Sequence, residues 1–254
     1  MQLGMVTYLW GAKWDLPTLI KNCEQTGFAG VELRSTHAHG VEVSLSPMER
    51  TEVSHRFSDS SVVCVGLGSA CEYHSADPQI VEQNVELTKQ FVNLSHDVGA
   101  TGVKVRPNGF VKGEEPERTI DRIGNALQEC GKYAADYGQE IRLEVHGRET
   151  KDPAVIRKIL EVAGHPAVRA CWNANPGETV NGSLQTSFDL LKDHLGATTH
   201  IHDLYDTEYP YREFFALLRS INYDGWCLSE SPDTSDPLRV MRYYKALWQE
   251  LIKP

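Results

Sequence analysis

The chain has 254 residues, with 25 lysines and arginines against 35 aspartates and glutamates, and so a formal net charge of −10 at pH 7. Charged residues make up 24% of the chain and hydrophobic residues 41%, a balance that indicates a globular domain and excludes a disordered chain. The acidic excess argues against broad electrostatic binding to a nucleic-acid backbone, so we expect no nucleic-acid partner.

Membrane and disulfide signals are missing from the sequence. No apolar stretch reaches the roughly 18 residues of a membrane span, and the first residues lack the basic-then-apolar pattern of a signal peptide. We therefore expect a cytoplasmic protein without a membrane partner. The six cysteines include no CxxC pair, which favours reduced thiols over a disulfide framework.

Short apolar runs rich in β-branched residues alternate with amphipathic helical stretches along the whole chain. Each run has the length and composition of a buried strand. The predicted strands span residues 3–8, 29–34, 61–67, 101–106, 140–146, 167–173, 198–203 and 225–230.

The helices between these strands have sequence signals at both ends. Aspartate followed by proline begins three of them, because the carboxylate accepts from free backbone N–H groups and proline at the first position loses no hydrogen bond. These pairs are Asp77-Pro78, Asp152-Pro153 and Asp236-Pro237, and Ser46 with Glu49 forms a capping box at a fourth helix. Glycines at positions 27, 99, 138, 164 and 196 predict the helix ends.

Strands that alternate with helices pair in parallel through right-handed crossovers. Eight such units in about 250 residues match the size of a single (β/α)8 TIM barrel of the α/β class, with eight parallel strands. No linker or change in composition divides the chain, so we assign residues 1–254 to one domain. An open, doubly wound sheet is the alternative, but the first strand carries no glycine-rich phosphate loop.

Side chains along a barrel strand point alternately into the barrel and toward the helices. On the fifth predicted strand, Glu144 and His146 share one face, whereas Leu143 and Val145 share the other. The same alternation places further polar residues inside the barrel: Glu32, Arg34, Lys104, Arg106, Arg169, Asn173, His200, His202 and Glu230.

These inward polar residues gather at the carboxyl ends of the strands, where barrel enzymes have their active sites. Buried charges are unfavourable unless they are paired or bind an ion. Glu144, Glu230, Asn173 and one of the two histidines form a donor set that suits Mn²⁺, Mg²⁺, Co²⁺ or Zn²⁺. The sequence therefore predicts one divalent metal ion at the barrel mouth.

A barrel interior filled with internal ion pairs is the alternative to a metal site. Glu32 would then pair with Arg34 or Lys104. We favour the metal site, because no structural need brings several carboxylates and imidazoles to the same end of a barrel.

Five motifs occur in order on strands two, five, six, seven and eight: GVELR, LEVH, CWNANP, HIHD and YDGWCLSE. In this order and placement the chain resembles the xylose isomerase-like TIM barrels, a superfamily of sugar phosphate isomerases and epimerases that is also related to endonuclease IV-type barrels. The resemblance extends over essentially the whole chain.

The resemblance implies a single divalent ion held by one residue from each of strands five to eight. The implied ligands are Glu144, Asn173, His200 and Glu230. His200 is favoured over His202 because HIHD resembles the family's HxxD pattern. The choice stays open, since His202 and Asp206 have the same spacing.

Asn173 departs from the family, which usually has an acid at this position. An amide oxygen still binds a metal, but one negative charge is missing. A pair of unit charges 4 Å apart is worth about 4 kcal/mol at an effective dielectric constant of about 20, so we expect weaker metal binding.

The resemblance also implies the chemistry. In the family the metal polarises a carbonyl group, one glutamate removes the proton from the neighbouring carbon to give an enediolate, and a second glutamate returns a proton from the opposite face. Glu144 and Glu230 would be this catalytic pair. The implied activity is isomerisation or epimerisation of a small sugar, keto-sugar or sugar phosphate.

Other side chains near the mouth are expected to contact the carbohydrate substrate. Lys104 and Arg106 would fix an oxyanion, a carboxylate or a phosphate, unless they pair with Glu32 or Glu144. Trp10 would form a flat apolar wall, although packing in the core is the common role of a tryptophan. The full set of expected substrate contacts is Trp10, Glu32, Lys104, Arg106, His146 and His202.

Other functions are weighed against epimerisation. A metal-dependent dehydratase or lyase acting on a cyclitol or keto-sugar would use the same proton abstraction. A non-catalytic sugar-binding barrel would have lost its metal site through Asn173. A repair nuclease is disfavoured by the net charge of −10 and by Asn173 in a ligand position. The oligomeric state stays open, and a homo-oligomer is compatible with the sequence.

Overall fold

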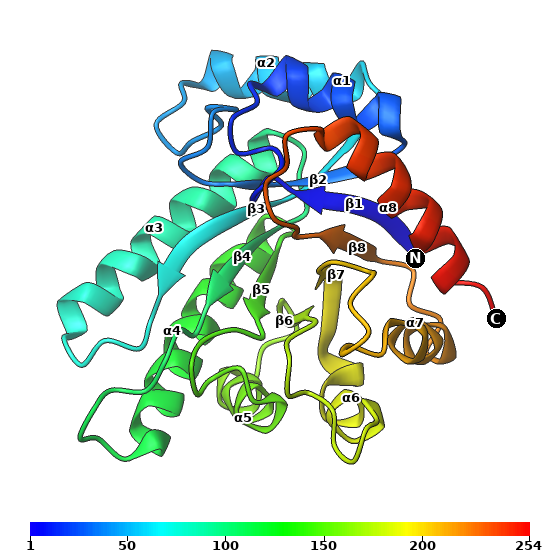
Figure 1. Ribbon diagram of the computed structural model, residues 1–254. Coiled ribbons are helices and arrows are strands. Elements are labelled where there is room, and N and C mark those ends of the chain that lie inside the picture. Colours follow the sequence, from blue (N-terminus) through cyan, green and yellow to red (C-terminus); the bar gives the residue numbers. More distant parts are fainter.

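The computed structural model describes all 254 residues. Eight strands lie at its centre (Figure 1): β1 (Gln2–Val6), β2 (Gly30–Arg34), β3 (Val63–Glu72), β4 (Gly102–Arg106), β5 (Glu140–Glu144), β6 (Val168–Asn173), β7 (Leu195–Ile201) and β8 (Trp226–Ser229). They pair in parallel and in sequence order, and β1 closes the ring on β8. The predicted TIM barrel with eight parallel strands is therefore confirmed.

Helices surround the ring of strands on its outer side (Figure 1). They are α1 (Leu16–Thr26), α2 (Pro47–Ser58), α3 (Pro78–Asp97), α4 (Pro116–Asp136), α5 (Pro153–Ala163), α6 (Gln185–Leu191), α7 (Tyr211–Ser220) and α8 (Pro237–Leu251), with a 3-10 turn η1 (Lys192–His194) after α6. None of these helices is both long and apolar enough to cross a lipid bilayer.

The predicted helix beginnings are confirmed by their capping hydrogen bonds. The Asp77 carboxylate accepts from the backbone N–H of Gln79 at the start of α3, and Asp152 and Asp236 cap α5 and α8 in the same way. Ser46 and Glu49 form the expected capping box of α2. Local side-chain chemistry thus determines where these helices begin.

Two strands extend well beyond their predicted bounds, whereas β1, β5 and β8 end earlier than predicted. β3 continues to Glu72, beyond the predicted end at residue 67, and β7 begins at Leu195. Gly196 therefore lies inside β7 instead of ending a helix. A side chain there would meet the neighbouring strand, because an added Cβ would lie 2.9 Å from the Cβ of Arg169. Close packing inside the barrel accounts for this glycine.

The outward faces of the strands and the inward faces of the helices form one hydrophobic core. Its members include Leu143 and Val145, which the sequence placed on the outer face of the fifth strand, and the apolar residues that alternate with polar ones on other strands: Val31, Leu33, Val103, Val105, Ala170, Trp172 and Ile201. The two-residue alternation therefore sorted these strand faces correctly, and the polar side chains of Glu32, Lys104, Glu144 and His200 meet inside the barrel.

Arg142 fills the barrel interior below the mouth, two residues before Glu144 on β5. Its guanidinium is buried, pairs with the Glu140 carboxylate at 2.9 Å and donates to Thr101 Oγ1 and the carbonyl of Val65. The space it occupies depends on a missing side chain, since a Cβ at Gly66 would lie 2.7 Å from the guanidinium. A fully satisfied cation thus closes this part of the barrel.

Replacing this cation tests its structural role. We expect Arg142→Met to lower the free energy of unfolding by about 3 kcal/mol, because buried acceptors and Glu140 lose their partner. Urea denaturation measures the loss. Arg56→Met, which removes an exposed arginine paired with Glu52, is the control and should cost about 0.5 kcal/mol. Equal losses in the two variants would contradict the role of Arg142.

Candidate functional site

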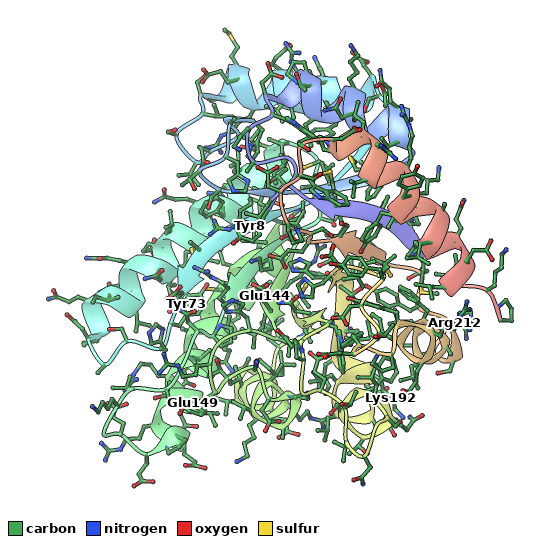
Figure 2. All side chains as sticks on the ribbon, viewed as in Figure 1. Tyr8, Tyr73, Glu144, Glu149, Lys192 and Arg212 are labelled. Carbon is green, nitrogen blue, oxygen red and sulfur yellow. The ribbon has the colours of Figure 1, made fainter.

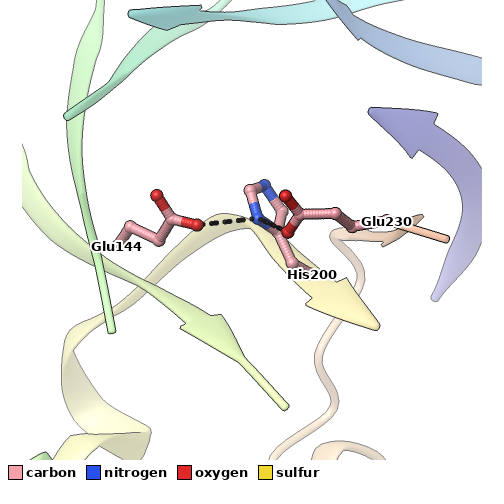
Figure 3. A group of neighbouring side chains, drawn as sticks. All are labelled: Glu144, His200 and Glu230. Carbon is pink, nitrogen blue, oxygen red and sulfur yellow. Dashed lines mark ion pairs between the residues drawn. The ribbon is translucent and has the colours of Figure 1, made fainter. Parts of the chain in front are cut away.

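Three side chains from the carboxyl ends of β5, β7 and β8 converge at the barrel mouth (Figure 3). The Nδ1 atom of His200 lies 3.4 Å from Oε1 of Glu144 and 3.3 Å from Oε2 of Glu230. One donor atom from each residue lies within 4.8 Å of the other two. The structure therefore brings together three of the four ligands that the sequence predicted.

Asn173, the fourth predicted ligand, borders this cluster. It ends β6 and lies opposite His200 in the register of β6 and β7. Its Nδ2 donates to Oε1 of Glu144 at 3.0 Å, whereas its Oδ1 is buried and has no hydrogen-bond partner. The amide thus contacts a candidate ligand and keeps one free oxygen.

The geometry groups His200, and not His202, with the glutamates. β7 ends at Ile201, so the strict alternation of side chains also ends there. The Nδ1 atom of His202 lies 3.0 Å from the backbone carbonyl oxygen of Glu230. The backbone N–H of His202 donates to the Tyr211 hydroxyl. His202 therefore holds the chain at the rim, next to the cluster.

Both cations on β4 are paired with carboxylates. Lys104 Nζ lies 2.7 Å from Oε2 of Glu144, and these side chains are only 5% and 3% exposed. Arg106 pairs with Glu72 at 2.8 Å. The pairing that the sequence left open for Lys104 is thus present with Glu144, whereas the partner of Arg106 was not foreseen, because it lies on the unpredicted extension of β3.

Glu32 is completely buried and faces the histidine of the cluster. Its Oε1 lies 3.5 Å from Nε2 of His200, and neither carboxylate oxygen has a hydrogen-bond partner. The expected alternative pairing with Arg34 is not formed, because that guanidinium donates to Ser35. Glu32 thus lies behind His200, on the side away from Glu144 and Glu230.

The charged groups of the cluster shift one another's pKa values. Burial alone would lower the pKa of His200, but Cys171, Glu32 and Glu144 together raise it well above its usual range. Burial would raise the pKa of Glu144, but Lys104 and His200 hold this pKa well below its usual range. The pKa of Glu230 is also lowered, mainly because contact with His200 outweighs burial. Both glutamates are therefore ionised, and together they stabilise a positive charge beside Nδ1 of His200.

The donor atoms at this point fit a divalent metal ion. His200 Nδ1, Glu230 Oε2 and Asn173 Oδ1 are buried without hydrogen-bond partners. Buried polar atoms normally have a partner, and a metal ion would supply one to all three. Carboxylate, amide and imidazole donors suit Mn²⁺, Mg²⁺, Co²⁺ or Zn²⁺.

His146 and Trp10 were both expected to contact the substrate, but only His146 lies near the mouth. His146 follows β5, is partly buried and has an unpartnered Nδ1; burial lowers its pKa, so a neutral imidazole is favoured. Trp10 does not form a wall at the mouth. It is buried in the core, edge-on to Phe28 and Tyr244, because successive turns after β1 fold its ring inward.

Tyr8, which the sequence interpretation did not single out, is the exposed aromatic residue of this loop (Figure 2). Its ring stacks on His37, with centroids 6.3 Å apart and planes 13° apart. The Nδ1 of His37 lies 2.9 Å from Thr7 Oγ1. The predicted first strand included residue 8, but β1 ends at Val6, so Tyr8 lies in the same loop as Trp10.

Another buried carboxylate, Glu178, was also not predicted. It lies in the loop after β6, where it accepts hydrogen bonds from the Tyr209 hydroxyl at 2.9 Å and from Asn175 Nδ2 at 3.2 Å. Asn175 Nδ2 also donates to the carbonyl of Val145, directly after Glu144. This network ties the loop to the end of β5. No cation pairs with Glu178, and burial raises its pKa to about 7.

The fold and the cluster together define a TIM barrel with a candidate metal centre at its carboxyl mouth. The comparison with protein families is more specific. The sequence model of the xylose isomerase-like TIM barrel family matches residues 20–251. The chain belongs to this family.

Relatives of known activity or structure cover almost the whole chain. A ketose 3-epimerase from Arthrobacter globiformis is 25% identical over 270 residues, which are 98% of this chain and 91% of the relative. The structure of 3-keto-D-glucoside 4-epimerase from E. coli has a TM-score of 0.82 at 14% identity, over 98% of this chain and 99% of the other. The structure of the IOLI protein, which contains a zinc atom, has a TM-score of 0.81 at 13% identity, over 99% of this chain and 98% of the other.

The buried Glu178 carboxyl predicts a pH-dependent stability. Its pKa of about 7 in the folded chain lies above that in an unfolded chain, so folding favours the protonated form. The stabilisation is complete below about pH 4 and is lost as pH rises through 7. Relative to Glu178→Gln, which cannot ionise, the natural protein should lose about 3 kcal/mol between pH 5 and pH 9.

Urea denaturation across this pH range measures the difference. Glu82→Gln, which changes an exposed glutamate of α3, is the control and should follow the natural protein at every pH. Parallel stability profiles for the natural protein and Glu178→Gln would contradict the prediction.

Proposed function

We propose that the protein is a divalent-metal-dependent isomerase or epimerase that acts on a small sugar or keto-sugar by abstraction of an α-proton. The observation that carries the proposal is the pair of carboxylates, Glu144 and Glu230, whose oxygens lie 3.4 and 3.3 Å from the same imidazole nitrogen of His200. The named activities of the ketose 3-epimerase and the 3-keto-D-glucoside 4-epimerase support it.

Four residues would hold the ion: Glu144, Asn173, His200 and Glu230. When bound, the ion supplies Lewis-acid polarisation of the substrate carbonyl. One glutamate removes the proton from the neighbouring carbon, and the electron pair of the C–H bond moves toward the carbonyl oxygen to form an enediolate. The other glutamate first takes up a proton from a neighbouring donor and then passes it to carbon, and release of the abstracted proton to solvent and re-protonation of that donor restore the starting state.

The two glutamates have unequal surroundings, which assigns them different tasks. Glu144 is paired with Lys104 and is nearly inaccessible, whereas the side chain of Glu230 is 19% exposed and follows β8 at the rim. A base must reach the carbon-bound proton directly. We therefore assign the first proton abstraction from an entering substrate to Glu230. The proton return is assigned to Glu144 after its carboxylate has taken up a proton from the Lys104 ammonium, whose Nζ lies 2.7 Å from Oε2.

The charges at the mouth favour an uncharged substrate. Both β4 cations already have carboxylate partners, and burial lowers the pKa of His146. A phosphate or carboxylate group of a substrate would therefore find no unpaired cation on β4, and the guanidinium of Arg34 on β2 already donates to Ser35. We infer that a neutral keto-sugar is preferred over a sugar phosphate.

Solvent deuterium exchange tests the chemistry. With Mn²⁺ present, we expect deuterium to enter the carbon beside the carbonyl of a neutral keto-sugar, as followed by NMR over a panel of ketoses. A chelator should abolish the exchange. Glu144→Gln and Glu230→Gln should each reduce it by about 10²- to 10⁴-fold, the range of general acid–base catalysis.

The exposed Glu82→Gln variant serves as the matched control and should keep full exchange. Exchange that survives the chelator or either active-site substitution would contradict the proposal. Ketose binding that raises the unfolding temperature without any exchange would instead identify a sugar-binding barrel.

Restoring an acid at position 173 tests the ligand assignment. Asn173→Asp adds a negative charge beside the cluster, so we expect Mn²⁺ to bind at least about tenfold more tightly, as measured by isothermal titration calorimetry. Without the ion, the additional carboxylate faces Glu144 and should lower the unfolding temperature. Unchanged or weaker Mn²⁺ binding would show that residue 173 does not contact the ion.

A further inference from the structure

A lysine lies directly beside the candidate metal ligands. Lys104 Nζ is 2.7 Å from Oε2 of Glu144, and both side chains are almost completely buried. An ammonium group at this place is unfavourable for a cation site, because it repels the ion and competes for the same carboxylate. The pair therefore needs an explanation beyond metal binding itself.

The two oxygens of Glu144 face different partners. Oε2 contacts Lys104, whereas Oε1 accepts from Asn173 Nδ2 at 3.0 Å and lies 3.4 Å from His200 Nδ1. These contacts fix the rotation of the carboxylate, so that only Oε1 points toward the cluster. Lys104 thereby leaves a single oxygen of Glu144 for an ion.

Lys104 and Asn173 change the charge of the mouth in the same direction. Three carboxylates surround His200, namely Glu32, Glu144 and Glu230, and the ammonium of Lys104 offsets one of them. The amide at position 173 adds no further negative charge. Three carboxylates against one ammonium leave two negative charges for a divalent ion instead of three, and Glu144 keeps a cationic partner without the ion.

We propose that Lys104 is an internal counter-ion of the candidate metal site, which holds Glu144 in its ligand orientation without the ion and weakens the binding of a divalent ion. This proposal rests on the metal-dependent function proposed above. Its consequence is a site that is already organised before the ion binds and that exchanges its ion readily.

Substitution of Lys104 tests the proposal, with Mn²⁺ alone as the probe. Lys104→Met removes the charge, and we expect Mn²⁺ to bind about 10- to 100-fold more tightly, the scale on which neighbours of metal ligands change affinity. The EPR signal of free Mn²⁺ measures binding. Arg106→Met is the matched control, because it removes a cation from the same strand that is paired with Glu72 instead, and it should leave the Mn²⁺ affinity close to that of the natural protein.

Thermal unfolding provides a second readout. Without the ion, Lys104→Met should unfold at a lower temperature than the natural protein, because Glu144 has lost its partner. Saturating Mn²⁺ should close or reverse this difference, since the ion replaces the lost charge. Lys104→Gln, which can still donate to Glu144, should show the same tighter binding with a smaller loss of stability.

Equal or weaker Mn²⁺ binding by Lys104→Met and Lys104→Gln would overturn the proposal. Failure of both variants to fold in saturating Mn²⁺ would also overturn it, because the ion would then not replace the ammonium. The proposed function is tested separately. Deuterium exchange that persists in the presence of a chelator, or ketose binding without exchange, would contradict the proposed function, whatever the Mn²⁺ affinity of the Lys104 variants.

Discussion

Charges buried inside the barrel must be neutralised there, and this requirement shapes the structure along the strands. Below the mouth, Arg142 is satisfied by Glu140, Thr101 and a backbone carbonyl, and the absence of a side chain at Gly66 leaves room for it. At the mouth, Lys104 neutralises Glu144. Removing a charge is therefore costly at either level, because its buried partner is left alone.

The difference between the two levels is the basis of the proposed function. The guanidinium of Arg142 has acceptors on several sides, whereas atoms of His200, Glu230 and Asn173 at the mouth are buried and unpartnered. A structural interior satisfies its polar groups, and unsatisfied ones point to a bound ion or ligand. The chain belongs to the xylose isomerase-like TIM barrel family, and the unpartnered donors lie at the carboxyl mouth of its barrel.

The sequence predicted the features that repeat along the chain and missed those that depend on loop conformation. Alternation along each strand identified Glu144, Asn173 and His200, and the same alternation applied to EIRLE would have found Arg142. Alternation did not separate His200 from His202, because the strand ends between them. Trp10 and Glu178 lie in loops, where no periodicity tells a buried side chain from an exposed one.

The site depends on one divalent ion shared by Glu144, His200 and Glu230. A crystal structure of the protein grown with Mn²⁺, with anomalous data collected at the manganese edge, tests for this ion. We expect one anomalous peak at the barrel mouth, within coordination distance of Glu144 Oε1, His200 Nδ1 and Glu230 Oε2, with Lys104 still paired to Oε2 of Glu144. The absence of a peak at this point, despite saturating Mn²⁺, would show that the three residues do not share an ion.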